Sequence, residues 1–113
     1  DDEVAMRNAV RRVLQQSTLH DIISAQDGFQ AGVKIIAEKP DLIILDLSMP
    51  GLDGFEVIQF IRQRPDLTEL KILVLSGLAP DDLAEAVKIG ANDAIAKPFD
   101  NADLLGRVNN LLR

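Results

Sequence analysis

The sequence predicts an α/β fold, doubly wound, with a parallel sheet and helices on both of its faces. Short apolar runs alternate with segments of helical periodicity along the whole chain. Strands that are buried on both faces form such continuous apolar runs, and their alternation with helices is typical of parallel sheets with right-handed crossovers. Several of the apolar runs end in polar or charged residues. Such residues would lie at the carboxyl edge of the sheet, where ligands bind in open α/β folds.

The composition is that of one globular domain of ordinary size, and we expect a single domain over residues 1–113. The chain is 47% hydrophobic, which suffices for a single core. It has no run of about 18 apolar residues and no signal-peptide pattern, so nothing in it points to a membrane. It contains no cysteine. This excludes disulfides and thiol chemistry and is compatible with a reducing cytoplasm, where we expect the protein to act.

The charge balance argues against nucleic-acid binding by this domain. The chain has eighteen acidic and twelve basic residues, which gives a formal net charge of −6. Phosphate contacts need clustered Lys and Arg, and base stacking needs aromatic platforms, of which the chain has only four Phe. The densest basic spots are Arg11-Arg12 and residues 62–64. We interpret both as solvated helix faces.

The first half of the chain is expected to form a helix, a strand, a second helix and a second strand. An amphipathic helix is predicted over residues 3–15, and a strand over 19–25 is closed by Asp27-Gly28. The second helix stops before Pro40, and the second strand covers residues 42–47. The predicted inward residues of the first helix are Met6, Ala9, Val10, Val13 and Leu14, and those of the second are Phe29, Val33, Ile36 and Ala37.

The second half continues the same alternation. A turn at residues 51–54 leads into a helix that ends at Pro65-Asp66, and a strand follows over 71–76. The next helix starts at residues 79–82 and ends at Gly90, and a short strand covers about 93–96. The predicted inward residues are Val57, Ile58 and Ile61 in the first of these helices and Leu104, Leu105, Val108, Leu111 and Leu112 in a last helix.

Asp46 is the candidate functional residue that stands out most. It follows four apolar residues and is followed by Leu47 and a Ser-Met-Pro-Gly turn, so a buried strand ends by presenting a carboxylate. The ordinary alternative is that Asp46 only caps this turn. Other strand ends carry Ser76 and Lys97, and the chain opens with the acidic pair Asp1-Asp2. We interpret these residues as one constellation.

In this order and spacing, the segments resemble the receiver domain of two-component response regulators. The resemblance rests on Asp1-Asp2, the Leu-Asp-Leu-Ser-Met-Pro-Gly-Leu-Asp-Gly segment ending at Gly54, Leu75-Ser76-Gly77, Gly90-Ala91 and Lys97-Pro98-Phe99. It implies a phosphorylation-dependent signalling switch in which Asp46 accepts a phosphoryl group. The donor would be a sensor histidine kinase or a phosphotransfer protein. Such a domain catalyses only its own phosphorylation and dephosphorylation, so we do not expect an enzyme.

A magnesium ion is the expected cofactor. Asp1, Asp2 and Asp46 together carry a charge of about −3, which suits a hard divalent cation with oxygen ligands, and no His or Cys set competes for zinc. The resemblance assigns direct ligation to Asp2 and Asp46, a backbone carbonyl ligand to Ser48, and a mostly water-mediated contact to Asp1.

Lys97 and Ser76 are expected beside the phosphoryl group. By resemblance, Lys97 pairs with Asp46 before phosphorylation and with a phosphoryl oxygen afterwards, and Ser76 hydrogen-bonds the phosphoryl group. The alternatives are a surface lysine whose stem packs on the protein, and a serine that caps its loop.

The resemblance also implies five strands in the order 2-1-3-4-5, whereas the sequence offers four. The strand that is lacking is the first, which should precede Asp1. Without it, unpaired backbone groups would line a slot between the strands at 19–25 and 42–47. We therefore expect the receiver domain to be incomplete at its N-terminus, with an apolar strand before Asp1 in a longer polypeptide.

Two departures from the family pattern keep other functions open. Ala94 stands where receivers commonly have Tyr or Phe, which leaves room for a degenerate receiver that acts as a constitutive protein-interaction module. On the face used for dimerisation in one DNA-binding subfamily, Asp103 and Arg107 fit the pattern, whereas Leu83 and Asn92 do not. An enzymatic alternative, a haloacid-dehalogenase-like phosphatase, needs a second Asp where this chain has Ser48.

Overall fold

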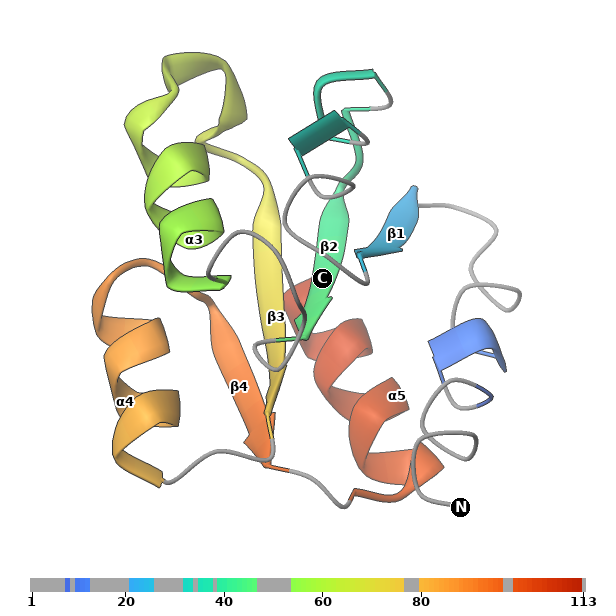
Figure 1. The fold of residues 1–113 in the computed structure, drawn as a ribbon. Coiled ribbons are helices and arrows are strands. Elements are labelled where there is room, and N and C mark those ends of the chain that lie inside the picture. The colour runs from blue at the N-terminus through green and yellow to red at the C-terminus, as the bar shows by residue number, and fades with distance from the viewer. Residues whose placement is uncertain are drawn as a thin grey trace.

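The computed structural model of the chain contains a four-stranded parallel sheet in the order β1–β2–β3–β4, with helices on both sides (Figure 1). The predicted α/β class is therefore confirmed. The structure describes residues 8, 10–12, 21–25, 32–33, 35–37, 39–46, 54–76, 80–96 and 99–112.

The described elements follow the predicted alternation. The strands are β1 (Ile22–Ala25), β2 (Leu42–Asp46), β3 (Lys71–Ser76) and β4 (Asp93–Ala96). The helices are α3 (Gly54–Gln63), α4 (Pro80–Lys88) and α5 (Asn101–Leu111), with a 3-10 turn η1 (Pro65–Leu67). The predicted bounds of β3 and β4 are confirmed. Residues 8 and 10–12 are helical, which agrees with the first predicted helix.

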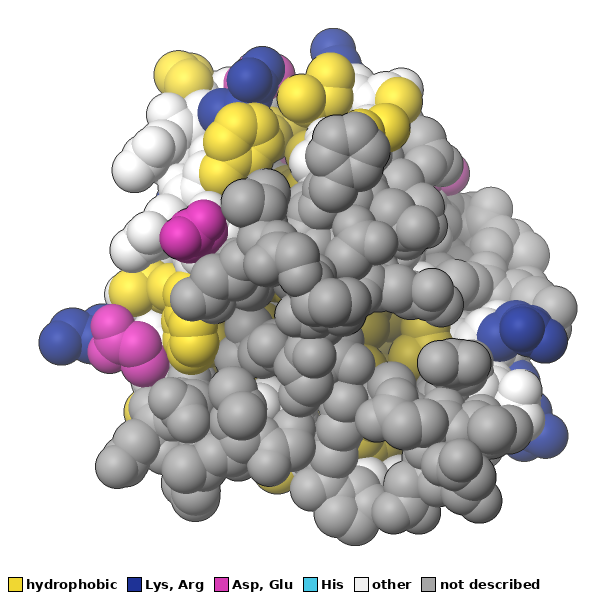
Figure 2. All heavy atoms as spheres, in the orientation of Figure 1, with side chains coloured by type: hydrophobic (Ala, Val, Ile, Leu, Met, Phe, Trp, Pro, Cys, Tyr) yellow, Lys and Arg dark blue, Asp and Glu magenta, His cyan; other side chains and the backbone are white. Residues whose placement is uncertain are grey.

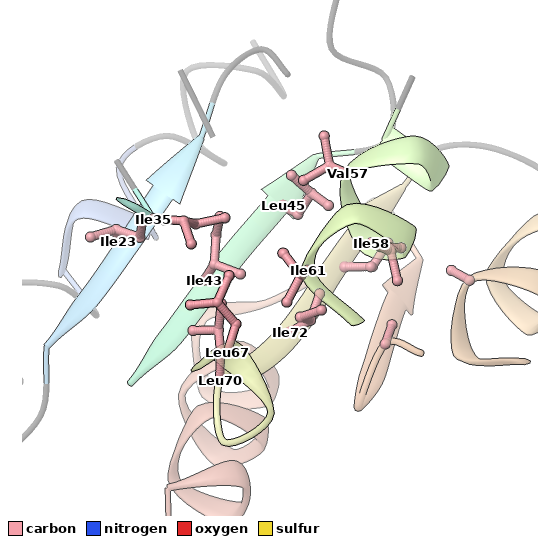
Figure 3. Close-up of a cluster of buried hydrophobic side chains, with 13 residues drawn as sticks. Ile23, Ile35, Ile43, Leu45, Val57, Ile58, Ile61, Leu67, Leu70 and Ile72 are labelled. Carbon is pink, nitrogen blue, oxygen red and sulfur yellow. The ribbon is translucent and has the colours of Figure 1, made fainter. Parts of the chain in front are cut away.

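The two faces of the sheet are covered by separate apolar clusters. Ile43 and Leu45 of β2 contribute to one cluster, and Leu42 and Ile44 contribute to the other. The first cluster also contains residues of α3 and Ala86 of α4, and Figure 3 shows how its side chains from α3 and the strands meet. The second cluster contains residues of α5 and Val10. Because successive residues of a strand point to opposite faces, the central strands are apolar except at their ends, where Asp46, Lys71 and Ser76 stand.

The predicted slot beside β1 is not found. β1 pairs directly with β2, with Ile22 opposite Leu42. The carbonyl oxygen of Asp21 accepts hydrogen bonds from the backbone N–H groups of Asp41 at 2.7 Å and Leu42 at 3.2 Å. The prediction of an open slot was therefore wrong, and the five-strand order 2-1-3-4-5 is not confirmed. The physical reason is that unpaired backbone groups inside a sheet are costly, and direct pairing satisfies them.

The buried face of the helix before Pro40 also differs from the prediction. Ile35 is completely buried in the first cluster, whereas Val33 and Ile36 are 51% and 53% exposed and Ala37 is exposed. This segment has apolar residues on more than one side, so periodicity alone does not select the side that meets the sheet. The inward residues predicted for α3 are confirmed, since Val57, Ile58 and Ile61 are all buried.

Gly90 closes α4 in a conformation that suits glycine. Its φ is +137°, and the backbone N–H groups of Gly90 and Ala91 donate to the carbonyl oxygens of Val87 and Ala86 at 3.1 and 2.9 Å. This is the hydrogen-bond pattern of a helix end that turns through a left-handed glycine. A Cβ at this position would stand 2.5 Å from Cγ of Arg62. Both the backbone angle and the arginine stem therefore exclude a side chain.

We predict opposite effects for alanine at two glycines. Gly90→Ala should lower the free energy of unfolding by about 1–3 kcal/mol, because it strains the backbone and displaces Arg62. Gly106→Ala, in the exposed middle of α5 with nothing within 4 Å of the added Cβ, should raise it by about 0.5–1 kcal/mol. Urea denaturation of both variants measures this. Equal stability of Gly90→Ala and the unchanged protein would contradict the conclusion that a side chain is excluded at Gly90.

Candidate functional site

The carboxyl ends of three neighbouring strands meet at one edge of the sheet. In the parallel register, Asp46 of β2 lies opposite Leu75 of β3, and Ser76 lies opposite Ala96 of β4. Asp46, Ser76 and Ala96 are the last residues of their strands, and Figure 1 shows these strands running in the same direction. The backbone thus brings Asp46 and Ser76 to the same edge, and Lys97 follows Ala96 directly in sequence.

Ser76 is the buried polar residue at this edge. Its exposed fraction is 0%, and it is the only polar residue classed as buried among those that the structure describes. No buried side-chain nitrogen or oxygen atom in the described part of the chain is left without a hydrogen-bond partner. A hydroxyl withdrawn from water is costly without such a partner, and the hydroxyl of Ser76 has one within the protein. The burial of Ser76 is compatible both with a role in capping its loop and with a role beside a bound group.

The remaining predicted site residues are outside the described residues. These are Asp1, Asp2, Ser48 and Lys97, together with the side chain of Asp46. The residues that are described contain no group of three acidic or histidine side chains that could hold a metal ion. The fit to Mg²⁺ therefore rests on the chemistry of the predicted donors. Three carboxylates and one carbonyl form an all-oxygen set, which is the set that Mg²⁺ prefers.

Arg62 was not recognised from the sequence. We expected a solvated helix face, but Arg62 is partly buried and donates from its three guanidinium nitrogens to three different acceptors. Burial lowers the pKa of Arg62 below its ordinary value. No local pattern in the sequence distinguishes it from its neighbour Arg64, because its acceptors are up to 30 residues away.

The other basic residues agree with the expectation of solvated faces. Arg11 and Arg12 are both exposed, and Figure 2 shows basic side chains over this part of the molecule. The guanidinium of Arg64 lies 5.6 Å from the centroid of the Phe60 ring and forms an exposed ion pair with Asp66 at 3.2 Å. Its hydrogen bond to Asp66 lowers the pKa of that carboxyl group.

Arg107 links α5 to β4. Its Nε donates to Asp103 at 3.1 Å, and its Nη1 donates to Asp93 at 2.9 Å and to the carbonyl oxygen of Ala94 at 3.1 Å. The pKa of Arg107 is raised, chiefly by the hydrogen bond to Asp103 and further by Asp93. Ala94 is partly buried and packs against the cluster that contains α3 and α4. The small side chain at this position thus belongs to the core packing.

Sequence comparison shows the class of protein that carries this sheet edge. Residues 1–109 match the family described as response regulator receiver domain. The chain belongs to this family, whose members are signalling proteins, as the resemblance implied. Membership also argues against the phosphatase interpretation.

Individual relatives agree with this assignment. The response regulator MprA of Mycolicibacterium vanbaalenii is 40% identical over the whole chain, which spans 48% of that protein. The DNA-binding dual master transcriptional regulator RpaA of Synechocystis is 35% identical, and the chain spans 47% of it. The crystal structure of a response regulator receiver domain from Bermanella marisrubri is 43% identical, with a TM-score of 0.78 over 100% of this chain and 93% of that one.

The extent of these matches differs between the two kinds of relative. The chain spans about half the length of the curated regulators but nearly all of the solved receiver domain. It therefore corresponds to the receiver part of such regulators. Among the described residues, no helix has the length and apolar character needed to cross a membrane.

Proposed function

We propose that this domain is a phosphorylation-dependent switch, which accepts a phosphoryl group on Asp46 in the presence of Mg²⁺ and then alters an interaction surface. The observation that carries the proposal is the placement of Asp46 at the end of β2, at the same sheet edge as the buried Ser76. Membership of the receiver family supports it. The phosphoryl donor would be a sensor histidine kinase or a phosphotransfer protein.

The proposed reaction is a transfer from phosphohistidine to a carboxylate. An oxygen of Asp46 attacks the phosphorus atom, and the bond between phosphorus and the imidazole nitrogen breaks. The imidazole leaves with the bonding electrons and takes up a proton from water, and Asp46 becomes an acyl phosphate. A carboxylate is already ionised at neutral pH, so the reaction needs alignment and charge neutralisation but no general base.

Mg²⁺ would supply that neutralisation when bound, since it offsets the charge of the carboxylates and of the phosphoryl oxygens. The residues that would hold it are Asp1, Asp2 and Asp46, with the backbone carbonyl of Ser48. Lys97 would pair with a phosphoryl oxygen. Ser76 would donate its hydroxyl hydrogen to another.

The readout of the switch would be a change in a surface that an output domain or effector protein recognises. In the curated relatives MprA and RpaA, the names indicate a response regulator and a DNA-binding transcriptional regulator. For this domain, we propose no nucleic-acid contact of its own, in keeping with its acidic charge. The cytoplasmic location expected from the sequence stays a prediction.

Asp46→Asn should abolish phosphoryl uptake and leave the fold intact or slightly more stable. The amide has nearly the same volume but no nucleophilic carboxylate, and it removes one charge from a repulsive acidic cluster. The phosphoryl uptake of each variant is measured by incubation with a radiolabelled acyl phosphate and, separately, by intact-protein mass spectrometry. The control is Asp66→Asn, which changes an exposed acid on η1 and should keep full uptake. Wild-type uptake by Asp46→Asn would refute the proposal.

Asp2→Ala should weaken Mg²⁺ binding more than Asp1→Ala. The first substitution removes a proposed direct ligand, and the second removes a contact made through water, so we expect the affinities to differ by about tenfold or more. Because the chain has no Trp or Tyr, isothermal titration calorimetry is the suitable measurement. Equal losses of affinity in the two variants would overturn this ranking.

Ser76→Ala should retain phosphorylation of Asp46 but lose the structural response. With Ala94 lacking a ring, the shift of the Ser76 hydroxyl toward the phosphoryl group is the proposed route to the surface formed by α4, β4 and α5. Amide hydrogen exchange on that surface, with and without Mg²⁺ and beryllofluoride, tests this route. The matched control is Ser24→Ala on β1, which should respond like wild type. An unchanged response in Ser76→Ala would show that the signal leaves by another path.

A further inference from the structure

Among the described residues, three of the four large apolar side chains that are exposed belong to two neighbouring segments. Val33 and Ile36, in the helix before Pro40, are 51% and 53% exposed, and Phe60 of α3 is 39% exposed. The fourth is Val87 of α4. Single exposed apolar residues are common on protein surfaces, whereas a group of them at one place marks an interaction site. The relative position of the three side chains therefore decides their meaning.

The helix before Pro40 and the end of α3 lie side by side. Ile35 of the first helix is buried in the same apolar cluster as the inward residues of α3. The pKa of the Asp66 carboxyl group is lowered, chiefly by the hydrogen bond from Arg64 and in part by the charge of Lys39, which therefore lies within reach. Figure 2 shows apolar and basic side chains together at the top of the molecule, where Figure 1 places the end of α3 and the segment before β2. We define the α3-side patch as Val33, Ile36 and Phe60, with Lys39 and Arg64 at their border.

The two bases at the border of the patch differ in how their charge is balanced. Arg64 lies over the Phe60 ring and forms its ion pair with Asp66. Lys39 is exposed, and no carboxylate among the described residues forms an ion pair with it. The described charges of the patch are therefore net positive, in a chain whose net charge is −6.

Lys39 also has a backbone conformation that favours glycine. Its φ is +46°, and it is the only residue other than glycine with a positive φ among those described. Its backbone N–H donates to the carbonyl oxygen of Ile35 at 3.0 Å, so Lys39 ends the helix where glycine is the usual residue. A lysine costs free energy in this conformation, and no ion pair in the described part of the chain offsets that cost. Such a residue points to a use of its side chain outside the fold.

We propose that the α3-side patch binds a segment of another protein in which apolar side chains lie beside Asp or Glu. The apolar centre of the patch would bury the apolar side chains of the partner, with Phe60 as the aromatic anchor. Lys39 and Arg64 at the border would pair with its carboxylates. A second copy of this chain fits less well, because two copies of the patch would bring charges of the same sign together.

The patch lies away from the sheet edge that carries Asp46 and Ser76. These two residues end β2 and β3, whereas residues 36–39 and 60–66 precede the same two strands. In a parallel sheet, segments that enter the strands lie at the opposite edge from the strand ends. A partner would therefore bind the patch without covering the candidate phosphorylation site, and the proposal does not depend on phosphorylation.

The probe for this surface is a dye-labelled helical peptide with leucine on one face and glutamate on the other. The intact chain is used without Mg²⁺ or a phosphoryl donor. Fluorescence anisotropy should show saturable binding, and a peptide with lysine in place of glutamate should bind at least about tenfold more weakly. Phe60→Ser should weaken binding of the glutamate peptide about tenfold. The matched control is Val87→Ser on α4, which removes an exposed apolar side chain elsewhere and should leave the affinity unchanged.

Lys39→Gly separates a role in binding from a role in the fold. The substitution relieves the left-handed conformation, so the midpoint of urea denaturation should rise. The affinity for the glutamate peptide should nevertheless fall about fivefold, because a charge at the border is lost. Lys88→Ala, which removes an exposed lysine from the last turn of α4, is the control and should leave the affinity unchanged.

Several outcomes would overturn the proposal. These are the absence of saturable binding, equal affinity for the two peptides, and an unchanged affinity in either Phe60→Ser or Lys39→Gly. Should Phe60→Ser fail to fold, Ile36→Ser serves for the same comparison. Sedimentation of the chain alone tests the other occupant. A dimer that Phe60→Ser converts to a monomer would show that a second copy covers the patch and would also overturn the proposal.

Discussion

The burial of β2 and β3 on both faces is the constraint on which the rest of the structure depends. Residues 42–45 of β2 and 72–76 of β3 are buried, so their backbone polar groups must be paired within the sheet. Their side chains alternate between two apolar clusters, one toward α3 and α4 and the other toward α5. A shift of one residue in register would exchange the two faces, and this fixes the pairing. The positions of the strand ends follow from it.

The same constraint explains why the candidate functional residues lie at the ends of the strands. A charged side chain inside β2 or β3 would have to be buried without water, which is costly, so such residues collect where the strands end. Asp46 ends β2, and Ser76 ends β3 as the buried hydroxyl at this edge. The register sets these two ends nearly level, which is the placement that the proposed function requires.

The helices are attached to this sheet in different ways. α3 contributes Val57, Ile58 and Ile61 to the buried cluster, and its position is set by apolar packing. Among the described side chains of α4, Ala86 belongs to this cluster, and Arg62 of α3 donates to the carbonyl oxygen of Gly90 in the turn that follows α4. Apolar packing resists displacement over a whole face, whereas the hydrogen bonds of one side chain resist it at one point.

The sequence by itself determined the α/β class, the bounds of β3 and β4, the inward face of α3 and the family. Each of these follows from local signals, such as apolar runs, helical periodicity and short motifs in order. The tertiary structure decided the direct pairing of β1 with β2, the burial of Ile35 in place of Val33 and Ile36, and the role of Arg62. These depend on which segments meet in space. An apolar segment with two similar sides, or an arginine whose acceptors lie up to 30 residues away, has no local pattern that specifies its partner.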